Sequence, residues 1–213
     1  MSENIGEINE ETLEDTGLSG KSDVDMKSQA VEDIDKEVKE LLRAKNIKSA
    51  KEKLNTALDN DNLSEEEKAM LSIRLITVSI MEKNRKKARD IANDILKNKN
   101  ISEKTKVRVK AKMLEVELSS KHYKDAIKLR NQLRPVLDSG MLEEKGNRDL
   151  KVNSIILAIK EENYEEAKDL LQSILIDKKS SAYVVAAELL MKTMMLEGNY
   201  ETANDFAQKM LSD

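Results

Sequence analysis

The sequence predicts an all-α protein built from repeated helix pairs, and three observations support this prediction. Ala, Glu, Leu, Lys and Arg make up 103 of the 213 residues, close to the ~50% that is typical of long helices. Gly and Pro together number only seven and aromatic residues only five, whereas sheets need turn residues and β-branched or aromatic strands. From about residue 29, apolar residues recur at helical spacing in segments separated by short breaks of Asn, Asp, Ser or Gly.

Residues 1–28 differ in composition from the rest of the chain. They contain eight acidic and two basic residues, a net charge of −6, and three of the six Gly. A segment without a sustained apolar stripe cannot bury enough surface to offset its ordering entropy. We therefore expect a flexible, disordered acidic tail over 1–28 and a helical repeat domain over 29–213. An acidic arm that binds a partner or folds over the body is the alternative.

The helices begin and end at recognisable signals. Residues 60–65 and 98–103 form two similar breaks 38 residues apart, each with a Ser that can cap the next helix. Ser64 and Glu67 have the spacing of a capping box. Apolar stripes predict the first two helices around the following residues: Val31, Ile34, Val38 and Leu41, then Ala50, Leu54, Ala57 and Leu58.

A short motif repeats five times and ends each time in Ala. A small residue at one place in every helix lets a neighbouring backbone approach closely, and a larger residue two turns later fills the space beyond. The alanines are separated by 38, 38, 41 and 36 residues. The copies are Asn46-Ile47-Lys48-Ser49-Ala50, Asn84-Arg85-Lys86-Lys87-Ala88, His122-Tyr123-Lys124-Asp125-Ala126, Asn163-Tyr164-Glu165-Glu166-Ala167 and Asn199-Tyr200-Glu201-Thr202-Ala203.

This motif resembles the start of the second helix in the tetratricopeptide repeat (TPR) family. The resemblance spans about residues 30–213 and implies a TPR-like α-solenoid of antiparallel helix pairs. The chain departs from the family in lacking its Trp and its helix-ending Pro. It also carries bulky residues where the first helix usually has Gly or Ala: Val38, Ile76, Leu114, Ile155 and Met191. A solenoid of the HEAT or armadillo kind is the alternative fold.

The third pair contains an irregularity. Pro135 lies inside a helical pattern and Gly140 follows it. A Pro inside a helix removes a backbone hydrogen bond and kinks the helix, and Gly140 suits a left-handed C-cap. We expect a bend or break in the array near residues 134–146.

The sequence lacks the residue patterns of an enzyme. There is no Cys, and His122 is the only His, so few general bases remain near neutral pH. Residues Gly20-Lys21-Ser22 lack the preceding Gly of a phosphate-binding loop, and Asp59-Asn60-Asp61 lacks the Gly and acid of a calcium loop. We predict no catalytic, cofactor-binding or metal-binding residues. Without a signal sequence or apolar span, we expect a cytoplasmic protein.

Four basic residues are candidates for binding a partner. By the resemblance, Lys39, Arg74, Arg108 and Lys112 fall near the groove lined by the first helices, where TPR proteins usually bind peptides or domains. Arg108 and Lys112 match in character the clamp of relatives that hold acidic chaperone tails. Asp35, Lys39 and Arg74 depart from it. These residues favour an acidic ligand over a true chaperone tail.

Residues 82–112 form a wider basic stretch, with twelve bases, four acids and a net charge of +8. Neutralising nucleic-acid phosphates is one use for such charge. The stretch has no aromatic residue for base stacking, and the whole chain is acidic. An acidic protein segment is therefore the preferred partner, with a nucleic-acid-associated regulator as the alternative. The acidic 1–28 segment could mask this stretch, in which case deleting residues 2–28 should strengthen partner binding.

The second candidate surface is the C-terminal edge of the array. Helical repeats generally need a polar capping element at their ends, and the fifth pair is rich in apolar residues here. Its flexible Met side chains suit adaptable interfaces. A partner or a second copy of the chain could bind Met194, Met195, Phe206 and Met210.

These observations predict a non-catalytic protein-interaction module, such as an adaptor, scaffold or assembly chaperone. Three of the four Tyr occupy one slot of the repeat. We expect these three to serve the architecture and not a binding surface.

Overall fold

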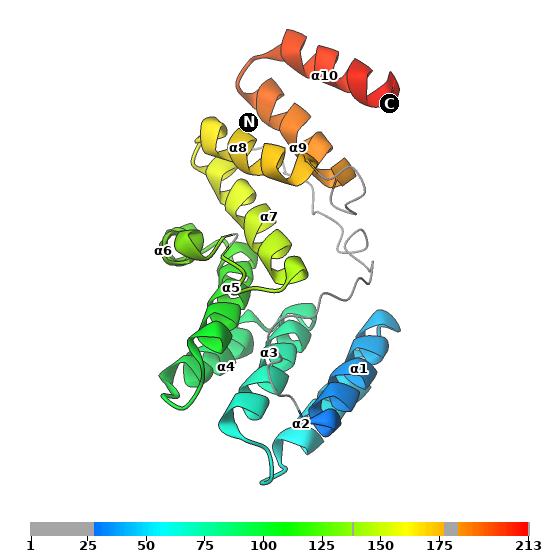
Figure 1. Ribbon diagram of the computed structural model, residues 1–213, viewed down its shortest axis with the longest axis vertical. Helices are drawn as coiled ribbons and strands as arrows, with labels where there is room; N and C mark the ends of the chain where they lie inside the picture. Colours follow the sequence, from blue (N-terminus) through cyan, green and yellow to red (C-terminus); the bar gives the residue numbers. More distant parts are fainter. Residues whose placement is uncertain (1–27, 138, 177–182, 213) are drawn as a thin grey trace. The chain divides into compact units, whose positions relative to one another are not determined.

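The computed structural model describes residues 28–137, 139–176 and 183–212, and all regular structure within them is helical (Figure 1). This confirms the all-α prediction. The predicted tail lies outside the described residues except for Ser28, and α1 begins at the predicted boundary. The helices are α1 Gln29–Arg43, α2 Ile47–Leu58, α3 Glu65–Met81, α4 Arg85–Lys97, α5 Glu103–Ser119, α6 Tyr123–Leu133, η2 Arg134–Val136, α7 Glu144–Lys160, α8 Tyr164–Leu175, α9 Tyr183–Leu196 and α10 Tyr200–Ser212.

The described residues fall into two compact units that meet in the sequence at Asn153 and Ser154, within α7. In the first unit, each helix from α1 to α6 packs against the next along the chain. The first helices of successive pairs also pack together, α1 against α3 and α3 against α5. In the second unit, α8 packs against α9 and α9 against α10. These contacts are those of stacked antiparallel helix pairs.

The repeat alanine marks the closest packing in each pair. Ala50, Ala88, Ala126 and Ala167 are completely buried, and Ala203 is 6% exposed. In the first pair, Ala50 and Leu54 share a core with Leu71 and Leu75 of the following pair. The predicted reason for a small residue at this place therefore agrees with its burial.

Each helix pair is joined by the same turn. The residue five places before the repeat Ala has a positive φ, near +57° at Lys45, Lys83, Lys121 and Glu162 and +84° at Gly198. The next N–H donates to a carbonyl five residues back, as from Asn46 to Leu41 at 2.8 Å. Together with the bond from Lys45 N–H to Leu42, this is the Schellman motif that ends a helix.

Four of these five turns hold a side chain where Gly is the better residue. A left-handed conformation costs an L-residue roughly 1–2 kcal/mol. Replacing that residue by Gly removes this cost, but part of the gain is lost because Gly gives up more backbone entropy on folding. We expect Lys83→Gly and Lys121→Gly each to raise the free energy of unfolding by about 0.5–1 kcal/mol in urea denaturation. The matched control, Lys128→Gly within α6, should lower it by about 1 kcal/mol. A lower free energy of unfolding in all three variants, Lys83→Gly, Lys121→Gly and Lys128→Gly, would contradict this assignment of the turn.

The predicted capping box is present at the start of α3. Ser64 Oγ accepts from Glu67 N–H at 3.3 Å, and Glu67 Oε2 accepts from Ser64 N–H at 2.9 Å. Ser28 N–H also donates to Glu67 Oε1 at 3.1 Å. Hydrogen bonds from Ser28 and then Ser64 lower the pKa of Glu67 from 4.5 to about 2. Glu67 therefore connects the start of α1 to the start of α3.

Pro135 ends a helix instead of kinking one. Helix α6 stops at Leu133, and Pro135 lies in the short turn η2, where a missing N–H is tolerated. Gly140 has φ +76°, as expected. The helix therefore breaks locally. It ends two residues before Pro135, so Pro135 does not kink a continuous helix. A bend of the whole array near 134–146 remains a prediction.

Candidate functional site

The four predicted groove cations lie on successive first helices of the first unit, Lys39 on α1, Arg74 on α3, and Arg108 and Lys112 on α5. Each of the four forms an ion pair. Asp35 binds both Lys39 at 3.0 Å and Arg74 at 2.5 Å. Arg108 contacts Glu143 at 3.0 Å and Lys112 contacts Glu115 at 2.8 Å. Each of these cations therefore has a carboxylate partner within the chain, and Lys39 and Arg74 share the single charge of Asp35.

Asp35 occupies the centre of this row of charges. Burial raises its pKa, but hydrogen bonds and Coulombic attraction from Arg74, and then from Lys39, outweigh burial and lower the pKa from 3.8 to about 2. Lys112 is partly buried, which lowers its pKa, yet Glu115 and then Asp149 outweigh that effect and hold the pKa above its usual value. Asp149 itself has a raised pKa, chiefly because it is buried.

The lowered pKa of Asp35 predicts an acid-sensitive contribution to stability. Its folded pKa lies below its unfolded value, so the contribution is complete above about pH 3.8 and is lost as the pH falls toward 2. We expect Asp35→Asn to remove on the order of 2 kcal/mol at pH 7. The stability difference between Asp35→Asn and the unmodified chain should shrink between pH 4 and pH 2 in urea denaturation. A difference that does not change with pH would contradict the role of this charge.

The basic stretch 82–112 is partly neutralised within the fold. Its residues are divided between α4 and α5, and several of its bases form ion pairs within the fold. Lys97 pairs with Asp94 at 3.0 Å and Lys106 pairs with Glu103 at 2.6 Å. The net charge of +8 therefore overstates the charge that is available to any one ligand.

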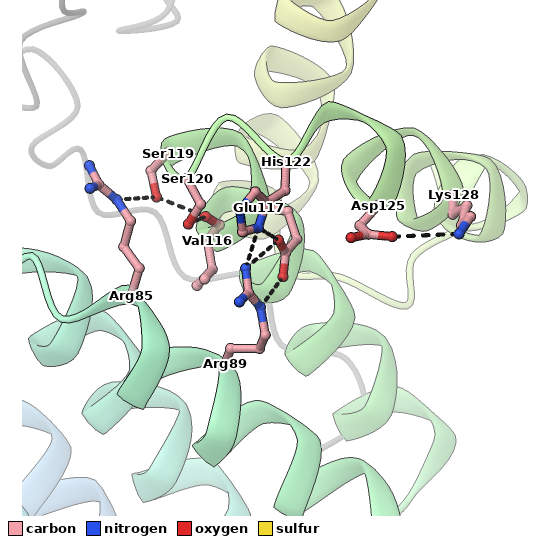
Figure 2. Close-up of polar contacts among 9 residues, drawn as sticks. All are labelled: Arg85, Arg89, Val116, Glu117, Ser119, Ser120, His122, Asp125 and Lys128. Carbon is pink, nitrogen blue, oxygen red and sulfur yellow. Dashed lines mark hydrogen bonds and ion pairs between the residues drawn. The ribbon is translucent and has the colours of Figure 1, made fainter.

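Arg89 of this stretch binds a buried carboxylate. Its Nε and Nη2 each lie 2.7 Å from an oxygen of Glu117, whose side chain is only 2% exposed (Figure 2). The hydrogen bond to Glu117 raises the pKa of Arg89 above its usual value. His122 Nδ1 completes the cluster, 3.0 Å from Glu117 Oε2 and 2.6 Å from Arg89 Nη2.

This cluster assigns a structural role to the only His. His122 is the N-cap residue of α6, as predicted, although its side chain forms no cap hydrogen bond. Glu117 was not identified as important from the sequence. Its place three residues after the buried Leu114 puts it on the apolar stripe of α5, and that position was the available signal.

The cation that follows the repeat Ala also pairs with an acid of the next helix pair in two other pairs, although that acid lies six residues before the next repeat Ala and Glu117 lies nine before it. The residue after the repeat Ala is Lys51 in the first pair and Lys168 in the fourth. Lys51 binds Glu82 at 2.6 Å, and Lys168 binds Glu197 at 3.0 Å. In the third pair this place holds Ile127, a side chain that cannot form an ion pair.

The four residues predicted to bind a partner at the C-terminal edge differ in exposure. Met195 is 52% exposed, whereas Met194, Phe206 and Met210 are half-buried. Met210 Sδ lies 3.4 Å from the hydroxyl of Tyr183.

Two exposed apolar residues of this edge were not predicted. Leu196 is 50% exposed and Tyr200 66% exposed, and both lie at the α9–α10 turn beside Met195. Tyr123 is also 36% exposed. The Tyr200 side chain is thus largely exposed to solvent, and an architectural role for these Tyr remains a prediction.

The described residues contain neither a grouped set of metal ligands nor a helix that could span a membrane. Within residues 28–137, 139–176 and 183–212, no three or more His, Asp or Glu side chains are grouped so that they could hold a metal ion. None of the helices in these ranges is both long and apolar enough to cross a membrane.

Comparison with known proteins identifies the fold. No protein-family model and no curated protein matches the sequence. A crystal structure from Podosopora anserina, described as kinesin light chain nearly identical TPR-like repeats, matches with a TM-score of 0.68 at 11% identity, over 86% of this chain and 93% of that one. A tetratricopeptide repeat protein from Parabacteroides merdae matches with a TM-score of 0.45 at 12% identity, over 87% and 80%. The first match confirms a TPR-like fold in preference to the HEAT or armadillo alternative.

Proposed function

We propose that the protein is a non-catalytic interaction module that binds a partner protein through the α9–α10 edge, as an adaptor, scaffold or assembly chaperone would. One observation carries the proposal: Met195 is exposed at a place of the repeat that is packed in other pairs. Leu42 and Ile80, each eight residues before a repeat Ala as Met195 is, pack against clusters that include residues of the following pair.

The character of the edge favours a protein partner. Met195, Leu196 and Tyr200 expose half or more of their surface within one turn. Contiguous exposed apolar groups on a soluble fold typically mark an interface, and Tyr and Met are enriched at such interfaces.

The test is chemical cross-linking of affinity-purified complexes, followed by mass spectrometry. We expect cross-links from the α9–α10 turn to a partner, and we expect Met195→Lys to abolish them. The matched control is Ile176→Lys, because Ile176 is apolar and 86% exposed in the same unit. Light scattering measures the molar mass of both variants. A dimer that is lost in Met195→Lys and kept in Ile176→Lys would show that the partner is a second copy of the chain. Cross-links that survive Met195→Lys, or a wild-type chain without any partner at this turn, would overturn the proposal.

The groove of the first unit is a weaker candidate, since its predicted cations already have carboxylate partners. Masking of the basic stretch by residues 1–28 falls outside the described residues. It remains a prediction, tested by partner affinity after deletion of residues 2–28.

A further inference from the structure

Two neighbouring turns of the first unit lie side by side. Arg85 Nε, at the start of α4, is 3.4 Å from Ser119 Oγ at the end of α5. Arg89, on the next turn of α4, reaches His122 at the start of α6 (Figure 2). The α3–α4 turn and the α5–α6 turn therefore form one continuous edge.

Four exposed lysines gather on this edge, and we call them the turn lysines: Lys83, Lys86, Lys121 and Lys124. Within the part of the chain that the structure describes, none of them forms an ion pair. This distinguishes them from Lys39, Arg74, Arg108 and Lys112, each of which pairs with an acid of the chain.

The turn lysines occupy places that are unfavourable for folding. Lys86 and Lys124 are the second residues of α4 and α6, where the positive end of the helix dipole disfavours a cation. Lys83 and Lys121 have the left-handed conformation that suits Gly. Each of the two turns therefore contains two locally unfavourable features, a cation at a helix start and a side chain in the left-handed conformation.

The equivalent turns of the second unit mostly avoid such costs. The second residues of α8 and α10 are Glu165 and Glu201, which the dipole favours, and the left-handed place before α10 is Gly198. Local preferences in natural proteins are broken mainly at functional sites. The contrast between the two units points to a function for the positive charge on the turns of the first.

We propose that the turn lysines bind an acidic segment of a partner protein. This inference rests on the proposed function as a protein-interaction module, but it concerns a different surface. A few unpaired cations on two adjacent turns match a short run of carboxylates. Nucleic acid is disfavoured because the two turns offer only one aromatic side chain on which bases could stack. Tyr123 is the one aromatic residue in the two turns.

The experiment measures fluorescence anisotropy of a labelled oligoglutamate peptide titrated with the full chain at low and high salt. The test variant is Lys86→Glu with Lys124→Glu. This change should weaken peptide binding by about tenfold, which corresponds to ~1.4 kcal/mol. It should also raise the melting temperature, because acids now occupy the two helix starts. Loss of binding in a more stable protein cannot be attributed to unfolding.

The matched control is Lys36→Glu with Lys99→Glu, which makes the same change in net charge at exposed lysines outside the two turns. It should retain peptide binding. Equal loss in both variants, or no binding of the peptide at low salt, would overturn the proposal. The same titration is made with a single-stranded oligonucleotide of equal charge. If it binds the unmodified chain more tightly than the peptide does, and does not bind the Lys86→Glu, Lys124→Glu variant, the proposal is overturned in favour of nucleic acid. Because Met195 and Leu196 are unchanged throughout, none of these outcomes depends on the α9–α10 proposal.

Discussion

Replacing Arg89 by Met should lower the free energy of unfolding by about 3 kcal/mol, because a buried carboxylate then loses its guanidinium partner. Glu117 is 2% exposed and receives two hydrogen bonds of 2.7 Å from Arg89. Breaking a buried pair typically costs about 3–5 kcal/mol. We expect the lower end of this range, because the Arg89 side chain is 30% exposed and His122 remains 3.0 Å from Glu117. Urea denaturation at pH 7 measures the effect.

Two further variants show whether burial is the cause. Lys51→Met removes the ion pair of the cation that follows the repeat Ala in the first helix pair, Lys51 with Glu82, whose side chains are 30% and 26% exposed. It should cost no more than about 1 kcal/mol, as exposed pairs do. Combining Arg89→Met with Glu117→Leu removes both charges and should recover most of the loss. Equal costs for Lys51→Met and Arg89→Met would show that the burial of Glu117 has no special effect.

Replacing Ala88 by Leu should also destabilise the protein, by about 1–3 kcal/mol. Ala88 is completely buried and packs in a cluster with Ile76, Ala92 and Ile95. Extra methylene groups in a close-packed core force side chains off their rotamers and shift backbones. Thermal and urea unfolding both report the change.

The matched control for this change is Ala30→Leu. Ala30 is exposed on α1. Ala and Leu both have high helix propensity, so the change should not disturb the helix itself. We expect its effect to stay within about 0.5 kcal/mol, as for most surface substitutions. Equal stabilities of Ala88→Leu and Ala30→Leu would refute the packing role assigned to the repeat alanine.

The repeat was predictable because its signals are local. Helical periodicity, Ser and Asn caps and a small residue at fixed spacing each depend on neighbours within a turn or two of helix. The start of α1, the capping box at Ser64 and the place of each repeat Ala were therefore correctly predicted. The same holds for the second-helix starts at Tyr123, Tyr164 and Tyr200.

Charge was harder to interpret because ion pairing depends on distant residues. Lys39, Arg74, Arg108 and Lys112 look like a basic site when only cations are counted. Arg74 lies 39 residues from its partner Asp35, and Arg108 lies 35 residues from Glu143. No local pattern announces these two pairs, unlike the local pairs of Lys39 with Asp35 and Lys112 with Glu115. Binding of a ligand by these four cations remains a prediction.

The sequence by itself determined the all-α class, the five helix pairs and the composition of each turn, since these follow from residues close together in the chain. Only the tertiary structure decided which charges are neutralised and which apolar residues stay exposed. It buried Glu117 against Arg89, left the turn lysines without ion pairs among the described residues, and exposed Met195 and Tyr200. The physical reason is that desolvation and Coulomb energies depend on separation in space, which the stacking of successive pairs sets and sequence spacing does not.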